Sequence, residues 1–220
     1  DPPRQMSLDA HARKAQAVHL EVFGALHTLP ADDIGDGTLV LLGPAEPGFW
    51  AHVSESPEFT DGAPDPLDRW SARVISVLAD EMDGTAFFPF GTPLRPFMSW
   101  ALRSGRAWSS PVRLLVHDHA GLMVSFRGAV LLRVRLPLPS TGPFPCETCT
   151  ERPCITACPV GALTGADYDL DRCHDFLDRA QGTICMSQGC AVRHSCPAGH
   201  KYRRVIAQSA FHMERFHPCR

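Results

Sequence analysis

The cysteines of this chain are confined to its last third. All nine lie between Cys146 and Cys219, and the first 145 residues contain none. An odd, one-sided and closely spaced set, in a chain whose N-terminus shows no apolar export signal, is a poor framework for disulfides and a good one for metal ligands. The chain is also long enough to bury an apolar core without cross-links. The sequence therefore predicts a metal-binding segment attached to an ordinary globular domain.

The cysteine spacing favours iron–sulfur clusters. Four cysteines form the pattern C-x2-C-x4-C-x3-C-P, which differs from the bacterial ferredoxin run by two extra residues before the third cysteine. Three thiolates in such a tight loop can hold three corners of one cluster, while the fourth points away toward another. Two [4Fe–4S] clusters with crossed ligands are therefore expected. The first would take Cys146, Cys149, Cys154 and Cys196, and the second would take Cys158, Cys173, Cys185 and Cys190. Cys219 is left over as a free thiol.

Zinc is the main alternative for these eight thiols. Two sites of four cysteines would make the chain a zinc-stabilised interaction protein. The Cys-Pro endings at Cys158 and Cys196 and the unequal spacings favour iron–sulfur clusters, because zinc ribbons use paired C-x2-C knuckles.

Hydrophobic periodicity predicts the elements of the first two thirds. We expect a helix over 7–28, a strand over 38–42, a short helix within 47–56, a helix that begins at Asp65 and Pro66 and stops at Gly84, and a strand over 85–90. The order strand, helix, strand predicts a right-handed βαβ crossover.

The pattern then changes toward short elements. A helix is expected over 95–103, a hairpin that pairs 113–117 with 122–126 and has Gly121 in the left-handed conformation, and a half-exposed strand over 129–136. A proline-rich linker follows over 137–145. The whole indicates an α+β protein, with a small α/β domain over 1–140 and a ferredoxin-like domain over 141–220.

Several segments carry a resemblance to a known family. GLMVSFRGAVLLRVRLPL, then PCETCTERPCITACPVGAL, then YDLDRCHDFL and a final three-cysteine run ending in Cys-Pro are similar to the core of epoxyqueuosine reductase. The reductive dehalogenases share this arrangement. FFPFGTPLRPFMSWALRSG is weakly similar to the family's segment before the active site. In the family the ligands also run four, one and three, and the cysteine that matches Cys173 belongs to the second cluster.

The resemblance implies a corrinoid in an α/β domain related to nitroreductases, with the two clusters delivering single electrons to its cobalt. This chain departs from the family pattern. Its segment between LRSGRAWSS and LLVHDHAG is short, no Asp or Glu matches the family's acidic proton donor, and the helical repeats that hold tRNA are absent. We expect a minimal relative rather than a queuosine enzyme. It would be either a cobalamin-dependent or cobalamin-reducing oxidoreductase, or a stand-alone ferredoxin-type electron carrier.

Candidate cofactor residues outside the cysteines each have a plainer alternative. His117 and His119 are either ligands or proton donors at a cofactor pocket, or parts of a solvated turn that also contains Asp118. Arg95 and Arg127 either hold phosphates or carboxylates of a cofactor or serve as ordinary surface cations. The aromatic residues over 87–100 form either a cofactor wall or core packing.

Composition limits the partners. The formal net charge is −3, which argues against a nucleic-acid-binding surface, and no apolar stretch is long enough to cross a membrane. We expect a cytoplasmic protein that accepts electrons from a low-potential donor such as a flavodoxin or a ferredoxin reductase. The basic tail over 193–220 is either a docking surface for that donor or a solvated cover over the first cluster.

Overall fold

The computed structural model describes residues 6–218, which pack as two compact units. The first unit contains residues 6–106 together with 125–142, and the second contains 107–124 together with 143–218. Residues 107–124 thus pack with the cysteine-rich segment, although the sequence-based division places them in the first domain. The reason is apolar burial, since Val112, Val116 and Leu122 share one cluster with Cys154 and Cys196.

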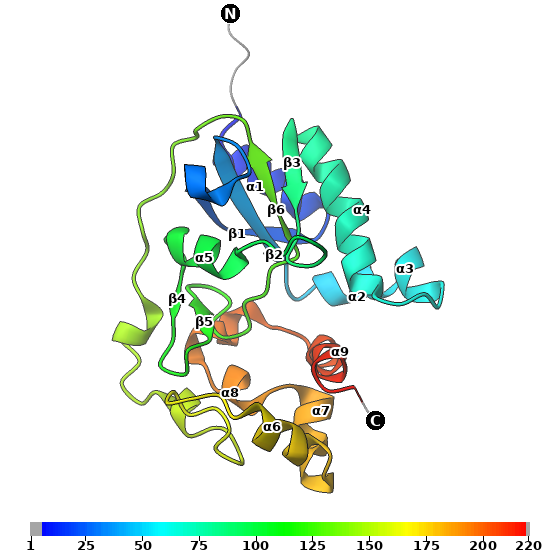
Figure 1. Cartoon of the computed structure of the whole chain (residues 1–220), viewed down its shortest axis with the longest axis vertical. Coiled ribbons are helices and arrows are strands. Elements are labelled where there is room, and N and C mark those ends of the chain that lie inside the picture. Colours follow the sequence, from blue (N-terminus) through cyan, green and yellow to red (C-terminus); the bar gives the residue numbers. More distant parts are fainter. Residues whose placement is uncertain (1–5, 219–220) are drawn as a thin grey trace, which may run out of the picture. The chain divides into compact units, whose positions relative to one another are not determined.

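The first unit is built on a four-stranded sheet (Figure 1). Its strands stand in the order β1-β2-β6-β3, and every neighbouring pair is antiparallel. Its elements are α1 (Leu8–Ala17), β1 (Leu20–His27), η1 (Pro30–Asp32), β2 (Thr38–Pro44), α2 (Phe49–Ser54), α3 (Pro57–Thr60), α4 (Pro66–Glu81), β3 (Gly84–Phe87), α5 (Phe97–Arg103) and β6 (Gly128–Leu132).

The predicted βαβ unit is present in altered form. Strands β2 and β3 run in the same direction and are joined through α4, but β6 lies between them and pairs antiparallel with both. Helix α4 packs against β3 and β6. A Cβ atom at Gly128 would lie 2.7 Å from Cδ1 of Ile75, so the missing side chain lets helix and strand approach closely.

Burial explains the central strands. All seven residues of β2 and all five of β6 are buried, as expected for continuous apolar runs covered on both faces. The predicted strand over 38–42, the short helix within 47–56 and the helix beginning at Pro66 are confirmed. Asp65 precedes that helix, but its side chain makes no capping hydrogen bond.

The predicted helix over 7–28 is wrong in its second half. Helix α1 ends at Ala17, and His19 has a φ of 59° that no helix continues through. Residues 20–27 then form β1 and pair with β2. The apolar residues of this stretch fit a helical spacing, yet pairing with the buried β2 decides the outcome.

The second unit consists of short elements. They are β4 (Ala107–Ser109), β5 (Leu115–His117), η2 (Pro145–Glu147), η3 (Pro153–Ile155), α6 (Leu170–Leu177), η4 (Ala180–Gly182), α7 (Thr183–Gln188), α8 (Ala191–His194), η5 (Pro197–Tyr202) and α9 (Ile206–Phe216). With both units taken together, the α+β class predicted from the sequence is confirmed.

The predicted hairpin is wrong in its pairing. Strand β5 pairs with β4, whereas 122–126 form no strand. The chain instead turns back at once, because His117 and Gly121 exchange both of their backbone hydrogen bonds. Gly121 does adopt the predicted left-handed conformation, with a φ of 55°.

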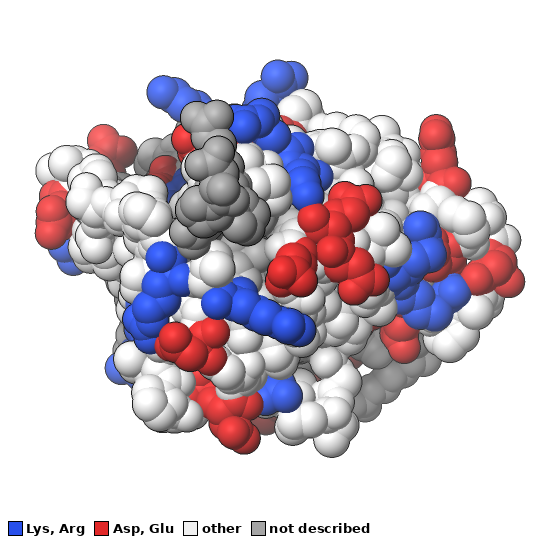
Figure 2. All heavy atoms as spheres, turned by 90° about the horizontal axis from the view of Figure 1, so that it is seen from above, with Lys and Arg blue, Asp and Glu red and all other residues white. Residues whose placement is uncertain are grey.

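The charged side chains on the face drawn in Figure 2 are of both signs, and the acidic and basic groups are interspersed. Within residues 6–218, no helix is both long and apolar enough to cross a membrane.

Candidate metal centres

The thiols of four cysteines from distant parts of the second unit are electrostatic neighbours. Cys146 belongs to η2, Cys149 follows it in a loop, Cys154 belongs to η3, and Cys196 is the N-cap residue of η5. The Cys146 thiol interacts with those of all three others, and the Cys154 thiol interacts with those of Cys196 and Cys149. These four are called the first group, and they are the set expected for the first cluster.

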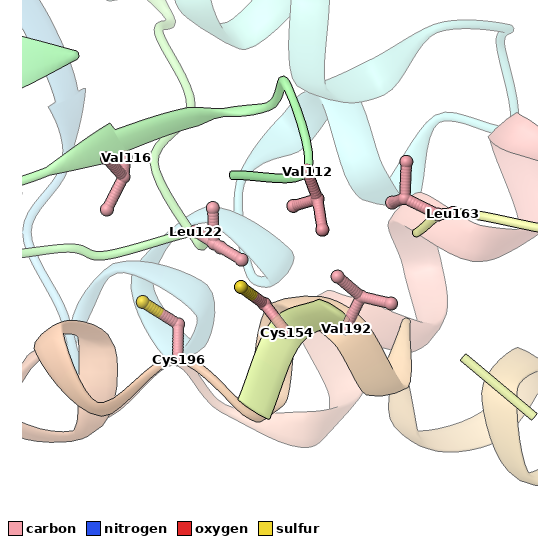
Figure 3. Close-up of a cluster of buried hydrophobic side chains, with 7 residues drawn as sticks. All are labelled: Val112, Val116, Leu122, Cys154, Leu163, Val192 and Cys196. Carbon is pink, nitrogen blue, oxygen red and sulfur yellow. The ribbon is translucent and has the colours of Figure 1, made fainter. Parts of the chain in front are cut away.

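A cavity of about 470 Å³ opens onto the first group. All four cysteines line it, and Val116 and Leu122 form part of its apolar wall. Figure 3 shows Val116 and Leu122 facing Cys154 and Cys196 across this part of the unit. The segment 107–124 thus supplies an apolar wall beside the four thiols.

Burial makes the metal-free thiols hold their protons. It is the main cause that raises the pKa of Cys146 to about 11, and the neighbouring thiolates of Cys196, Cys154 and Cys149 raise it further. Burial and then the Cys196 thiolate likewise raise the pKa of Cys154. Because metal ligands are thiolates, binding of a metal by these thiols would release protons.

A second group of four thiols lies farther along the chain. Cys158 follows η3, Cys173 belongs to α6, Cys185 to α7, and Cys190 is the N-cap residue of α8. The Cys173 thiol interacts with those of the other three, and the Cys185 thiol with those of Cys190 and Cys158. These four are called the second group, and they are the set expected for the second cluster.

Hydrogen-bond donors face the second group. The backbone N–H of Ala162 donates to Sγ of Cys158 over 3.2 Å, and the hydroxyl of Tyr168 donates to Sγ of Cys173 over 3.9 Å. Burial raises the pKa of Cys173, whereas the Tyr168 hydrogen bond opposes that rise. Such donors are the usual outer contacts of metal-bound thiolates.

The donor set fits clusters held by cysteine alone. Of the eight cysteines in the described part of the chain, none forms a disulfide. Within residues 6–218, no three or more His, Cys, Asp or Glu side chains are close enough to hold a single metal ion. Cys219 lies outside the described residues, so its predicted role as a free thiol stays a prediction.

Part of this chain is similar to a queuosine enzyme. Over 80 residues it is 35% identical to a protein named epoxyqueuosine reductase from Leadbetterella byssophila. The match covers 36% of this chain and spans a quarter of the length of that relative. No family model matches the chain, and no solved structure matches it.

The partial match to a reductase and the presence of two groups of cysteine thiols both fit a redox role.

The two predicted histidines, His117 and His119, lie in the segment 107–124 of the second unit. His117 is fully buried, and its Nδ1 accepts the backbone N–H groups of His119 and Ala120. It therefore stabilises the turn from within, which corrects the alternative of a solvated turn for this residue. His119 lies edge-on to the ring of Tyr202 at 5.5 Å. A role for either histidine at a cofactor stays a prediction.

The predicted arginines make contacts inside the first unit. Arg127 is buried, and its guanidinium binds the carboxylate of Asp68 and the hydroxyl of Ser71 on α4. Arg95 lies over the ring of Phe87, 5.2 Å from its centroid. These contacts hold both side chains within the first unit. A role in holding a cofactor stays a prediction for both residues.

The aromatic stretch and the basic tail also have defined places. Phe97 and Trp100 are buried in the first unit, as core packing requires. Helix α9 of the tail packs against α7, which carries Cys185 of the second group. The last helix of the tail thus packs beside the second group, while Pro197 and Ala198 near its start line the cavity of the first group.

The sequence analysis did not identify two residues that lie near the thiols of the second group. Tyr168 and Arg193 both interact with Cys190, and Tyr168 also contacts Cys173. Tyr168 precedes Cys173 by five residues, and Arg193 follows Cys190 by three. This closeness in sequence is the one signal that could have found them.

Proposed function

We propose that this chain is an iron–sulfur redox protein that carries two [4Fe–4S] clusters and transfers single electrons. The observation that supports it most is the gathering of eight cysteines into two all-thiol groups of four. Clusters bound by four cysteines accept and donate single electrons at potentials set by charge, hydrogen bonds and solvent exposure.

The protein's own residues have three tasks in this proposal. The eight thiols bind the clusters. The wall with Val116 and Leu122 keeps water from one side of the first group, since its residues are buried. The donors from Ala162 and Tyr168 stabilise negative charge on the sulfurs of the second group. A low-potential electron donor such as a flavodoxin or a ferredoxin reductase would supply the electrons.

Anaerobic reconstitution with iron and sulfide tests the proposal. About eight iron and eight sulfide per chain are expected, with a broad visible absorbance. Uptake of about two zinc ions in place of iron, with a colourless protein, would instead support a zinc-stabilised interaction protein.

Paired substitutions test which thiols share a cluster. With crossed ligands, the double variant of Cys154→Ser and Cys196→Ser touches one group and should keep about four iron per chain. The double variant of Cys154→Ser and Cys158→Ser touches both groups and should keep almost none. If the first four cysteines along the chain shared one cluster, the two variants would exchange these results.

The destination of the electrons is the second part of the proposal. We propose delivery to a corrinoid bound at the first unit, because the relative that this chain matches in part is an epoxyqueuosine reductase. Anaerobic titration with cob(II)alamin, followed in the corrin bands and the cobalt EPR signal, should show saturable binding. No binding by protein with intact clusters would leave a ferredoxin-type carrier without a second cofactor.

A further inference from the structure

The two cysteine groups differ in what faces their sulfurs. In the second group, Cys158 receives the N–H of Ala162, Cys185 that of Ala191, and Cys173 the hydroxyl of Tyr168. The remaining thiol, that of Cys190, interacts with the guanidinium of Arg193. Each sulfur of this group thus has its own donor or positive charge.

Two backbone donors of the first group serve the same sulfur. The N–H groups of Cys154 and Ile155 both donate to the sulfur of Cys154. Cys146 interacts with the positive charge of Arg152, whose side chain is exposed to solvent. Exposure screens a charge, so Arg152 acts weakly on the thiols beside it.

The donors of the second group are held in place by packing. The ring of Phe216 on α9 stacks on that of Tyr168, with 6.5 Å between centroids, so the phenol is partly covered. Arg193 is partly buried, and its Nη1 donates to the backbone oxygen of Leu122 over 2.6 Å. Fixed and partly desolvated groups act more strongly on a nearby charge than mobile ones in water.

We propose that the second group binds the higher-potential cluster and that Tyr168 and Arg193 are the positioning residues that raise its potential. This inference rests on the proposed function. Reduction adds one negative charge to a cluster, and a hydroxyl donor or a cation beside its thiolates stabilises that added charge. An electron passed from a cluster at the first group to one at the second would carry one negative charge with it, and Tyr168 and Arg193 would stabilise that charge at the second group.

The substitution Tyr168→Phe isolates the hydroxyl, because the ring that stacks on Phe216 remains. Loss of one hydrogen bond to a charged group should change the reduction equilibrium of the second cluster by up to about tenfold. For a one-electron couple this is a fall of up to about 59 mV, with the first cluster unchanged. Arg193→Gln keeps an N–H donor without the charge and should lower the same potential.

An anaerobic redox titration followed by EPR measures both potentials. The double variant of Cys154→Ser and Cys196→Ser, which keeps the second group, identifies the signal of the second cluster and should titrate at the higher potential. The matched control is Tyr202→Phe, which removes the hydroxyl from a buried tyrosine whose ring lies against His119 and Arg204. It should leave both potentials unchanged.

The outcomes separate this inference from the proposed function. A fall of the higher potential alone in Tyr168→Phe and in Arg193→Gln supports the inference. Unchanged potentials in both variants, or a shift of the lower one, in protein with about eight iron per chain, overturn it while the proposed function stands. Protein that takes up no iron overturns the proposed function and the inference with it.

Discussion

The contact between Gly121 and Gly199 provides a test of how the turn after β5 positions Cys196. Gly121 has a φ of 55°, and a Cβ atom there would lie 2.4 Å from the backbone nitrogen of Gly199. That nitrogen donates to the backbone oxygen of Cys196 over 3.1 Å. The substitution Gly121→Ala therefore strains its own backbone and displaces the segment that carries a thiol of the first group.

The expected cost has two parts. A left-handed conformation costs an L-residue about 1–2 kcal/mol. Forcing a side chain into a close backbone contact adds about 1–3 kcal/mol. Gly161→Ala is the matched control in the same unit, because Gly161 has a φ of 62° and its nearest atom would be Cγ2 of Thr164 at 3.9 Å. The control should carry the first part of the cost alone.

Urea unfolding of the metal-free variants and iron analysis of the reconstituted ones measure the two effects. Gly121→Ala should lower the free energy of unfolding by about 2–5 kcal/mol, and Gly161→Ala by about 1–2 kcal/mol. Gly121→Ala should also lose iron from the first cluster before the second. Equal destabilisation by the two variants, or loss of the second cluster first, would refute the reasoning.

Three further predictions concern stability in each unit. Arg103 chiefly holds the pKa of Asp32 down at about 2, so the ion pair stabilises the fold above pH 4 and loses that effect as the pH falls from about 4 to 2. Asp32→Asn should cost about 1–2 kcal/mol at pH 7 and much less near pH 2 in urea titrations; a cost independent of pH would contradict this. Gly128→Ala should cost about 1–3 kcal/mol by overpacking, and Ile75→Val should relieve part of it, whereas additive costs in a double-mutant cycle would rule the contact out. Chelation of iron should speed amide exchange in the second unit and leave β2 and β6 protected, and equal change in both units would show that metal binding stabilises the whole chain.

The errors of the sequence-based fold have a common physical cause. A short apolar run has no decisive period, so the stretch over 20–27 fits a helix until its partner β2 is known. In the same way, β5 pairs with β4, which has three residues. A strand this short shows no recognisable alternation of apolar and polar residues in the sequence. Long elements such as α4 were predictable because sixteen residues show a clear apolar stripe.

The grouping of the thiols was predictable for a different reason. A tight run lets three neighbouring thiols point to one centre and turns the fourth away, so Cys158 was expected to separate from Cys146, Cys149 and Cys154. In the structure the Cys146 thiol interacts with those of Cys149, Cys154 and Cys196, and the Cys173 thiol interacts with those of Cys158, Cys185 and Cys190. Their ligation of iron stays a prediction. Tyr168 could not be predicted from spacing alone, because its hydroxyl reaches Cys173 through the local path of the chain.

The architecture of the second unit follows from the shortness of its elements. Helices of four to eight residues cannot sustain themselves in water, so segments such as α6, α7 and α8 depend on contacts beyond their own hydrogen bonds. The first group obtains its cover from the β4–β5 hairpin, which comes before the proline-rich segment in the chain. The second group obtains cover from α9, which comes after the last of these cysteines and brings Phe216 onto Tyr168. The covers come from opposite ends of the unit and differ in chemistry, since one is an apolar wall and the other fixes a hydroxyl donor in place. Two centres held by the same four-thiol chemistry can therefore be given different potentials.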